Sequence, residues 1–314
     1  MTKLKSSEKE AISGYLFILP NFLGFLVFTL LPVIFSLVFS FVRWDLLSAP
    51  VFIGFSNFIS LLGFHKEGAG WIANDPLFWK CFGNTLYLMM IIPLEIMASL
   101  IVALVMNHKM KGMNFFKTVF FLPTITNGVA ICLLWYWIYN TDFGLINTVM
   151  VNAGRALGIH INGIPWLTST LWSKPSLMMM GLWIMIGGYN MILFLAALQG
   201  VPRELYEAAE IDGAGSWEKF WSITWPMISP TTFFVTIMAV IGGFQGGFMQ
   251  AYIMTGGGPE YSTTTLEYLI YNHLYSWHNV GYAAAIAWFV FIVIFLVTLF
   301  NWRFGGKLVQ YAHY

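Results

Sequence analysis

The sequence predicts an all-α, polytopic membrane protein with about six transmembrane helices, and three observations lead to this prediction. Of the 314 residues 58% are hydrophobic and 9% are charged, and the mean hydropathy is +0.72. Soluble domains carry about a quarter charged residues, so this chain cannot cover itself with a wetted surface. The apolar residues gather into runs long enough to cross a bilayer, and Lys and Arg concentrate on one side of those runs.

Each transmembrane helix needs roughly 20 apolar residues to cross a hydrocarbon core of about 30 Å. The runs that satisfy this are Gly14–Val42, Gly83–Met106, Thr118–Tyr139, Ser176–Leu198, Thr231–Thr255 and Tyr282–Phe300. Only Glu95 places a charge inside any of them. The first run is too long for a signal-peptide core and lacks a small-residue cleavage site, so we expect it to remain as a membrane span.

The distribution of Lys and Arg predicts the orientation. Ten of them fall on one side of the spans: Lys3, Lys5, Lys9, Lys109, Lys111, Lys117, Arg203, Lys219, Arg303 and Lys307. The other side has five: Arg43, Lys66, Lys80, Arg155 and Lys174. We therefore expect both termini in the cytoplasm. This orientation divides the chain into a tail of residues 1–12, a transmembrane domain of residues 13–303 and a tail of residues 304–314. The cytoplasmic loops are then 107–117 and 199–230, and the outer loops are 43–82, 140–175 and 256–281.

Segment 199–230 is the one long, charged loop expected in the cytoplasm. Its acidic residues are Glu204, Glu207, Glu210, Asp212 and Glu218, and apolar residues lie between them. A plain linker whose charges face water is the alternative reading. Such a linker has no use for Trp217, Phe220, Trp221 and Trp225, so we favour an amphipathic element that docks into a groove on a cytoplasmic partner.

The loop is typical of a helix–turn–helix. Pro202 suits the first helical position, and Gly213 stands where a C-terminal cap belongs. Ser216 can cap a second short helix. We expect Pro226 to stop that helix before Pro230 opens the next membrane span.

Within this loop, Glu207-Ala208-Ala209-Glu210-Ile211-Asp212-Gly213 followed by Ile223-Thr224-Trp225-Pro226 resembles the EAA loop of ABC-importer permeases. The longer stretch from Pro202 to Ala214 resembles the carbohydrate-uptake group, which includes the maltose permease. Shorter matches follow in the family's order: Phe78-Trp79, Gly83-Asn84-Thr85, Phe121-Leu122-Pro123, Asp142 to Asn147, Thr255 to Pro259 and Gly281 to Ala285. Trp225 departs from the pattern, because the family usually has leucine there.

This resemblance implies a type I importer permease in a bacterial or archaeal plasma membrane, with six spans and a core of five. It implies a second, non-identical permease, an extracytoplasmic solute-binding protein that delivers a sugar or polyol, and a dimeric cytoplasmic ATPase that holds ATP and Mg. The chain has no G-x-x-x-x-G-K-[ST] motif of its own, so we expect no catalytic residue and no cofactor on it. The resemblance assigns ATPase coupling to Glu207, Ala208, Ala209, Asp212 and Gly213.

Spans four and five flank this loop and carry the candidate substrate path. Aromatic faces suit the C–H surfaces of a sugar, and amides suit its hydroxyl groups. The candidates are Tyr189, Asn190, Phe244, Gln245 and Phe248, with Trp183 weaker. The resemblance adds that the maltose permease has a pocket tyrosine at the place of Tyr189. Packing against neighbouring helices is an equally good reading of any single aromatic, and close helix approach alone explains the glycines beside them.

Other chemistry finds little support. Glu95 has no second buried charge with which to form a proton relay, so we favour a structural or pore-lining role beside Pro93. Cys81 and Cys132 form no disulfide framework, and the six histidines show no zinc-binding pattern. A net charge of +1 gives no field for nucleic acid. A secondary transporter would show paired intramembrane charges and inverted repeats, a channel would show a repeated pore loop, and a membrane enzyme would show a catalytic constellation.

Overall fold

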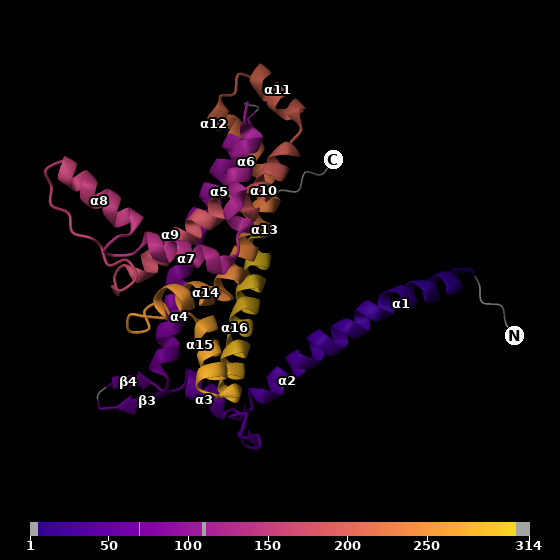
Figure 1. Ribbon diagram of the computed structural model, residues 1–314. Coiled ribbons are helices and arrows are strands. Elements are labelled where there is room, and N and C mark those ends of the chain that lie inside the picture. Colours follow the sequence, from indigo (N-terminus) through magenta and orange to yellow (C-terminus); the bar gives the residue numbers. More distant parts are fainter. Residues whose placement is uncertain (1–5, 69, 109–110, 306–314) are drawn as a thin grey trace. The chain divides into compact units, whose positions relative to one another are not determined.

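The computed structural model describes residues 6–68, 70–108 and 111–305 (Figure 1). The cations Lys3, Lys5, Lys109 and Lys307, and most of the predicted C-terminal tail, lie outside the described residues. The chain forms two compact units. One contains the residues up to Asp75 together with Ile270–Phe289, and the other contains Pro76–Leu269 together with the chain from Val290.

The first unit begins with a long apolar helix. Helix α1 (Ser6–Phe25), a π-helical turn (Leu26–Leu30) and α2 (Leu31–Phe39) form one candidate span, Ile12–Phe39. Two antiparallel pairs of short strands follow, β1 (Val42–Arg43) with β2 (Val51–Phe52) and β3 (Phe64–Glu67) with β4 (Gly70–Ala73), with α3 (Ser56–Leu62) between them. The π-turn Asn272–Ser276 and the start of α16 (Val280–Phe300) complete this unit.

The second unit is a bundle of membrane helices. Helices α4 (Pro76–Met89) and α5 (Ile92–Met106) make one span, and α9 (Ser173–Ile186) and α10 (Tyr189–Gln199) make another. Helices α6 (Met113–Ile125) and α7 (Gly128–Ile138) follow α5, and α8 (Leu145–Ala156) leads to α9. The chain then runs through α11 (Arg203–Ile211), α12 (Ser216–Lys219), a π-turn (Phe220–Thr224), α13 (Trp225–Phe244), α14 (Phe248–Gln250), a π-turn (Ala251–Thr255) and α15 (Leu266–Tyr271). The end of α16 and a last π-turn, Asn301–Gly305, close the unit.

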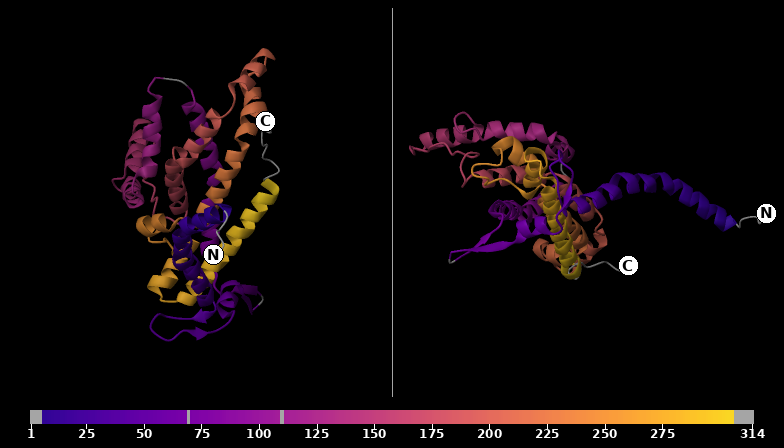
Figure 2. Two further views of the ribbon diagram at one scale, coloured as in Figure 1. Left: turned by 90° about the vertical axis from the view of Figure 1, so that its right-hand side faces the viewer. Right: turned by 90° about the horizontal axis from the view of Figure 1, so that it is seen from below.

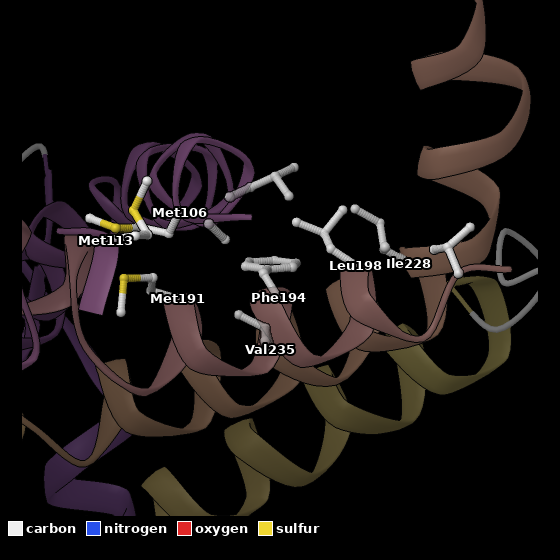
Figure 3. Packing of buried hydrophobic residues seen from close by; sticks show 10 residues of the cluster. Met106, Met113, Met191, Phe194, Leu198, Ile228 and Val235 are labelled. Carbon is white, nitrogen blue, oxygen red and sulfur yellow. The ribbon is translucent and has the colours of Figure 1, made fainter. Parts of the chain in front are cut away.

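The core of this unit lies between α5, α10 and α13. Leu100, Ala103, Met106, Met191, Phe194, Leu198, Ile228 and Val235 are buried there with Met113 and Val201. Figure 3 shows Phe194 of α10 facing Val235 of α13. Branched and thioether side chains fill the space between the three helices. Helix association in a membrane depends on such packing, because the hydrophobic effect does not favour contact between helices that lipid already surrounds. Figures 1 and 2 show the end of α5 and the α10–α13 connection at the same end of the unit.

The third predicted span is broken. Helices α6 and α7 meet at an angle of 98°. Asn127 begins α7 by accepting a hydrogen bond from the backbone N–H of Val129 at 2.9 Å, as an N-cap does. The pair still connects opposite ends of the unit. Met113 at its start packs in the cluster of Leu198, whereas Tyr139 at its end donates a hydrogen bond to the carbonyl of Ser176 at 2.8 Å. Counted as one span, the pair brings the candidate total to six.

The fifth predicted span has different bounds. The helix runs from Ser216 to Phe244, and not from Thr231 to Thr255. Pro226 does not stop it: the π-turn just before Trp225 widens the helix, and Pro226 follows within the first turn of α13. Ser216 is not the cap either, since Gly215 occupies that position without a side-chain hydrogen bond. The second half of the predicted loop is therefore the beginning of the membrane helix.

Candidate functional site

Helix α11, which carries most of the predicted coupling residues and is the predicted coupling helix, stands between two membrane helices and buries none of its residues. Pro202 is its N-cap, one position earlier than predicted. Its C-terminus is built as predicted. Gly213 has φ +80°, its N–H donates to the carbonyl of Glu210 at 3.1 Å, and the N–H of Ala214 donates to the carbonyl of Ala209 at 2.9 Å. These two bonds form a Schellman motif, which requires the left-handed conformation at Gly213.

The predicted coupling residues present an open surface. Glu207, Ala208 and Asp212 are exposed and Ala209 is half-buried. Ala208 and Ala209 put no bulk on the helix, so a groove of another protein can approach its backbone closely. Ile211, which the sequence reading left unassigned, is 88% exposed and adds an apolar contact at the tip.

Two side-chain bonds fasten α11 to the helix that follows it. Tyr206 and Thr224 share a hydrogen bond between their hydroxyl oxygens at 2.8 Å. Lys219 donates to a carboxylate oxygen of Glu210 at 2.8 Å. The exposed ion pair contributes little stability by itself, and together with the Tyr206–Thr224 bond it joins the two arms of the loop. Sequence reasoning missed both bonds. The opposite charges on either side of the Gly213-Ala214-Gly215 turn could have indicated the Lys219–Glu210 pair, but no sequence signal indicates the Tyr206–Thr224 bond.

The aromatic residues of the loop gather on the second arm. The rings of Trp217 and Trp221 lie 5.7 Å apart, as do those of Trp221 and Trp225, and Phe220 packs among them. Trp217 is 75% exposed. They therefore form an aromatic edge along the start of the long helix, at the level where Trp is commonly found at a membrane surface.

The fourth span breaks at Gly187 and Gly188, where α6 approaches most closely. A Cβ on Gly187 would overlap the backbone oxygen of Phe120, and one on Gly188 would lie 3.0 Å from the hydroxyl oxygen of Thr124. These glycines are needed for close approach of the two helices, which is the packing explanation that the sequence also allowed. Tyr189 follows directly, 65% exposed, with its ring edge-on to Phe121 at 5.7 Å.

Two polar groups near this break have no hydrogen-bond partner among the described residues, and the sequence reading did not include them. They are the hydroxyl of Thr124 and the ring N–H of Trp135. The Trp135 ring lies edge-on to Trp183 at 5.6 Å. Thr124 and Trp135 are thus donors placed beside two of the predicted path residues, Tyr189 and Trp183.

The other predicted group lies where the fifth span ends. Phe244 is the last residue of α13 and is buried, which favours packing, whereas Gln245 is exposed in the break. Gly247 has φ +93° and starts the short α14. The N–H of Phe248 donates to a carboxylate oxygen of Glu267 at 3.0 Å, and the Phe248 ring packs on Tyr252 and Tyr268. Burial raises the pKa of Glu267, and this hydrogen bond opposes the shift.

The two groups lie at different depths. Helices α10 and α13 pack side by side and run in opposite directions, because α11 and α12 join them. Measured from the facing pair Phe194 and Val235, Tyr189 is displaced by roughly 7 Å and Phe244 by roughly 13 Å in the same direction, at about 1.5 Å per residue. Tyr189 and Phe248 contact different partners. The structure thus places the candidates along a line and not around a single point.

Glu95 lies in the first turn of α5, just after the break between α4 and α5. Its side chain is half-buried and reaches toward Gly181 of α9, whose missing Cβ would stand 3.4 Å from the carboxylate. This placement favours the structural reading of Glu95.

Helices long and apolar enough to cross a membrane, with the exposed helix α11 between two antiparallel spans, are typical of an integral membrane subunit. The chain belongs to the family of binding-protein-dependent transport system inner membrane components, which it matches over residues 68–306. It is 33% identical to the probable ABC transporter permease protein YesP of Bacillus subtilis, over 99% of this chain and 96% of that protein. It is 34% identical to the lactose transport system permease protein LacF of Rhizobium radiobacter, over 95% and 96%.

The fold also matches that of a solved transporter. A chain of the bacterial alginate ABC transporter, in complex with an alginate pentasaccharide-bound periplasmic protein, superposes with a TM-score of 0.81. The match covers 98% of this chain and 99% of that one at 21% identity. The importer-permease fold expected from the resemblance is thereby confirmed.

Proposed function

We propose that this chain is a permease subunit of an ABC importer that carries a sugar or sugar-like polyol delivered by an extracytoplasmic solute-binding protein. The coupling helix is the observation that carries the proposal, because an exposed, rigidly capped helix between two membrane spans has no role within the chain itself. The lactose permease among the relatives and the lack of fixed charge at Tyr189, Asn190 and Gln245 support a neutral polyol.

ATP and Mg belong on a separate, dimeric ATPase in this proposal, since no phosphate-binding loop occurs in the sequence. Glu207 engages a basic residue at the rim of the ATPase groove, Ala208 and Ala209 allow close approach, and Gly213 with Asp212 forms the turn. A second, non-identical permease supplies the other half of the path.

The continuous helix from Ser216 to Phe244 is the lever. Its 29 residues span roughly 43 Å. The Lys219–Glu210 pair and the Tyr206–Thr224 bond tie its near end to α11, and its far end is the break that contains Gln245. Rocking of α11 by the ATPase therefore moves the break directly, and the membrane helices alternate between inward and outward access.

The substrate path runs along the two breaks. Tyr189, Asn190, Gln245 and Phe248 line it or lie just behind it, with Phe244 and Trp183 nearer to packing positions. Thr124 adds a hydrogen-bond donor beside Tyr189, and Trp135 adds one beside Trp183. A sugar that moves from the outer break to the inner one exchanges one aromatic face for another. Glu267, whose carboxylate accepts from the N–H of Phe248, is a charged group beside the outer break.

The orientation is part of the proposal: the chain lies in a bacterial or archaeal plasma membrane with both termini in the cytoplasm. Cysteine labelling with a membrane-impermeant probe tests it. A cysteine placed at Asn152 should react from outside in intact cells, and one placed at Ser216 should react only after the membrane is opened. The reverse pattern would contradict the topology.

Reconstitution tests the function. Proteoliposomes containing this chain, its partner permease and the ATPase should take up a sugar only when ATP is inside and the loaded binding protein is outside. A complex lacking this chain serves as the control. Uptake driven by a proton gradient without ATP would reject the proposal.

A further inference from the structure

An open cavity of about 1040 Å³ lies beside the coupling helix, and neither the coupling role nor the substrate path uses it. The end of α5, the start of α6, the end of α10 and the first turn of α11 surround it. Its charged lining residues are Lys111, Lys117 and Arg203, and His108 adds a titratable group. No acidic residue lines it, and none of the three cations forms an ion pair within residues 6–68, 70–108 and 111–305.

The lining has two characters. Asn107, Asn114 and Gln199 supply neutral amide donors beside the cations. Met106 and Met113 supply an apolar floor and belong to the buried core. A ligand with an anionic, oxygen-rich head and an apolar tail matches this combination. A free inorganic anion would leave the apolar floor without a partner.

The exposed surface next to the cavity has the character of a lipid-facing surface. Phe115 and Phe116 of α6 are 68% and 51% exposed, on the same turns that carry the lining residues Asn114 and Lys117. Exposed aromatic residues next to cations mark the level at which headgroups meet acyl chains. The cavity therefore opens where a phospholipid can place its phosphate among the cations and its chains against the phenylalanines.

We infer that this cavity binds the headgroup of an anionic phospholipid from the leaflet on the side of the coupling helix. The inference rests on the proposed orientation, in which that leaflet is the cytoplasmic one. Basic pockets between membrane helices on that side are suited to anionic headgroups. Because Arg203 is the first residue of α11, a bound headgroup joins the start of α6 to the coupling helix, and the lipid composition then sets how firmly α11 is held.

Lipid retention by the purified complex of this chain, its partner permease and the ATPase tests the site. Native mass spectrometry in neutral detergent would count bound dioleoylphosphatidylglycerol and, separately, dioleoylphosphatidylcholine. The double variant Lys111→Gln, Lys117→Gln should bind phosphatidylglycerol roughly 30-fold more weakly, since each cation near a membrane surface contributes about 1 kcal/mol. Lys111→Arg with Lys117→Arg keeps both charges and should retain the lipid.

The matched control is Lys66→Gln with Arg155→Gln, which removes the same net charge from exposed positions in the predicted outer loops and should leave retention unchanged. Equal retention by the glutamine variant and wild type would overturn the site. Displacement of the lipid by millimolar inorganic phosphate would show a soluble-anion site instead. Retention that appears only after the ATPase is removed would show that the ATPase fills the cavity. Failure of sugar uptake alone leaves this measurement unaffected, so the two proposals are tested separately.

Discussion

Replacing Gly213 by valine should uncouple the transporter. The left-handed conformation at φ +80° costs a residue with a Cβ about 1–2 kcal/mol, and a β-branched residue at least that much. No atom lies within 4 Å of the position that the new Cβ would take, so the cost is conformational and not steric. The chain avoids this cost by releasing the bonds from Gly213 to Glu210 and from Ala214 to Ala209. The last turn of α11 then frays, and it is the turn that carries Ala209 and the predicted contact residue Ala208.

A cost of about 2 kcal/mol lowers the population of the docked helix roughly 30-fold. ATP-driven sugar uptake into proteoliposomes should therefore fall by at least ten-fold in Gly213→Val, with normal amounts of assembled permease. Gly213→Asn is the matched control, because asparagine tolerates the left-handed region and should keep most of the uptake. Equal loss in both variants would point to side-chain bulk at the interface, and full uptake by Gly213→Val would refute the capping argument.

Three further outcomes are expected. Glu207→Lys should insert normally and abolish ATP-driven uptake, because it sets a cation against the basic rim proposed on the ATPase; near-normal uptake would reject that contact. Burial lowers the pKa of His273 from 6.5 to about 4 although the charge of Asp75 opposes this, so the folded state binds fewer protons than the unfolded state. Stability should therefore fall between pH 7.5 and 5, by at most about 2 kcal/mol because the ring is partly solvated. Unfolding of His273→Phe should show a flatter pH dependence, and an equal slope in both proteins would contradict this. Tyr189→Ala should alter uptake or sugar preference at normal protein levels, whereas Phe244→Ala should lower the amount of assembled complex; the opposite pairing would reverse their roles.

Much of the architecture was predictable, because apolar run length and charge distribution are direct consequences of the bilayer. The fourth span was predicted as Ser176–Leu198 and lies at Ser173–Gln199, and the sixth was predicted as Tyr282–Phe300 and lies at Val280–Arg303. The cap at Gly213 was also predictable, since it depends on local backbone chemistry alone.

The errors arose where the geometry of the neighbouring backbone or a distant contact overrides the sequence signal. Pro226 is a strong stop signal in sequence, but the π-turn before it lets the helix continue. After the fifth span ends at Phe244, the start of α14 is held by Glu267, which accepts from the backbone N–H of Phe248 across 19 residues. The 98° bend between α6 and α7 places Gly128 against Met249, whose sulfur would lie 2.8 Å from an added Cβ. No window along the chain contains such partners.

The candidate substrate path was predictable in composition and not in arrangement. Aromatic and amide residues at mid-span were identified, but the sequence treated both groups as points on regular helices. Both spans in fact break there. Gln245 follows the end of α13 and does not continue its helix, whereas Tyr189 and Asn190 begin α10. Thr124 and Trp135 were missed because an unpaired donor can be recognised only when its surroundings are known.

The environment of the first membrane helix affects which substitutions this helix can accept during evolution. None of the residues in the most apolar window of Ile12–Phe39 is buried within the chain, and a Cβ added at Gly14 or Gly24 would meet no atom within 4 Å. The family match begins only at residue 68, beyond this helix. Packing within the described residues therefore constrains these side chains little, apart from Ser36, which accepts a hydrogen bond from the ring N–H of Trp288 at 3.2 Å. We expect an anchor of this kind to be exchangeable between permeases, whereas a single added methyl group at Gly187 would meet backbone.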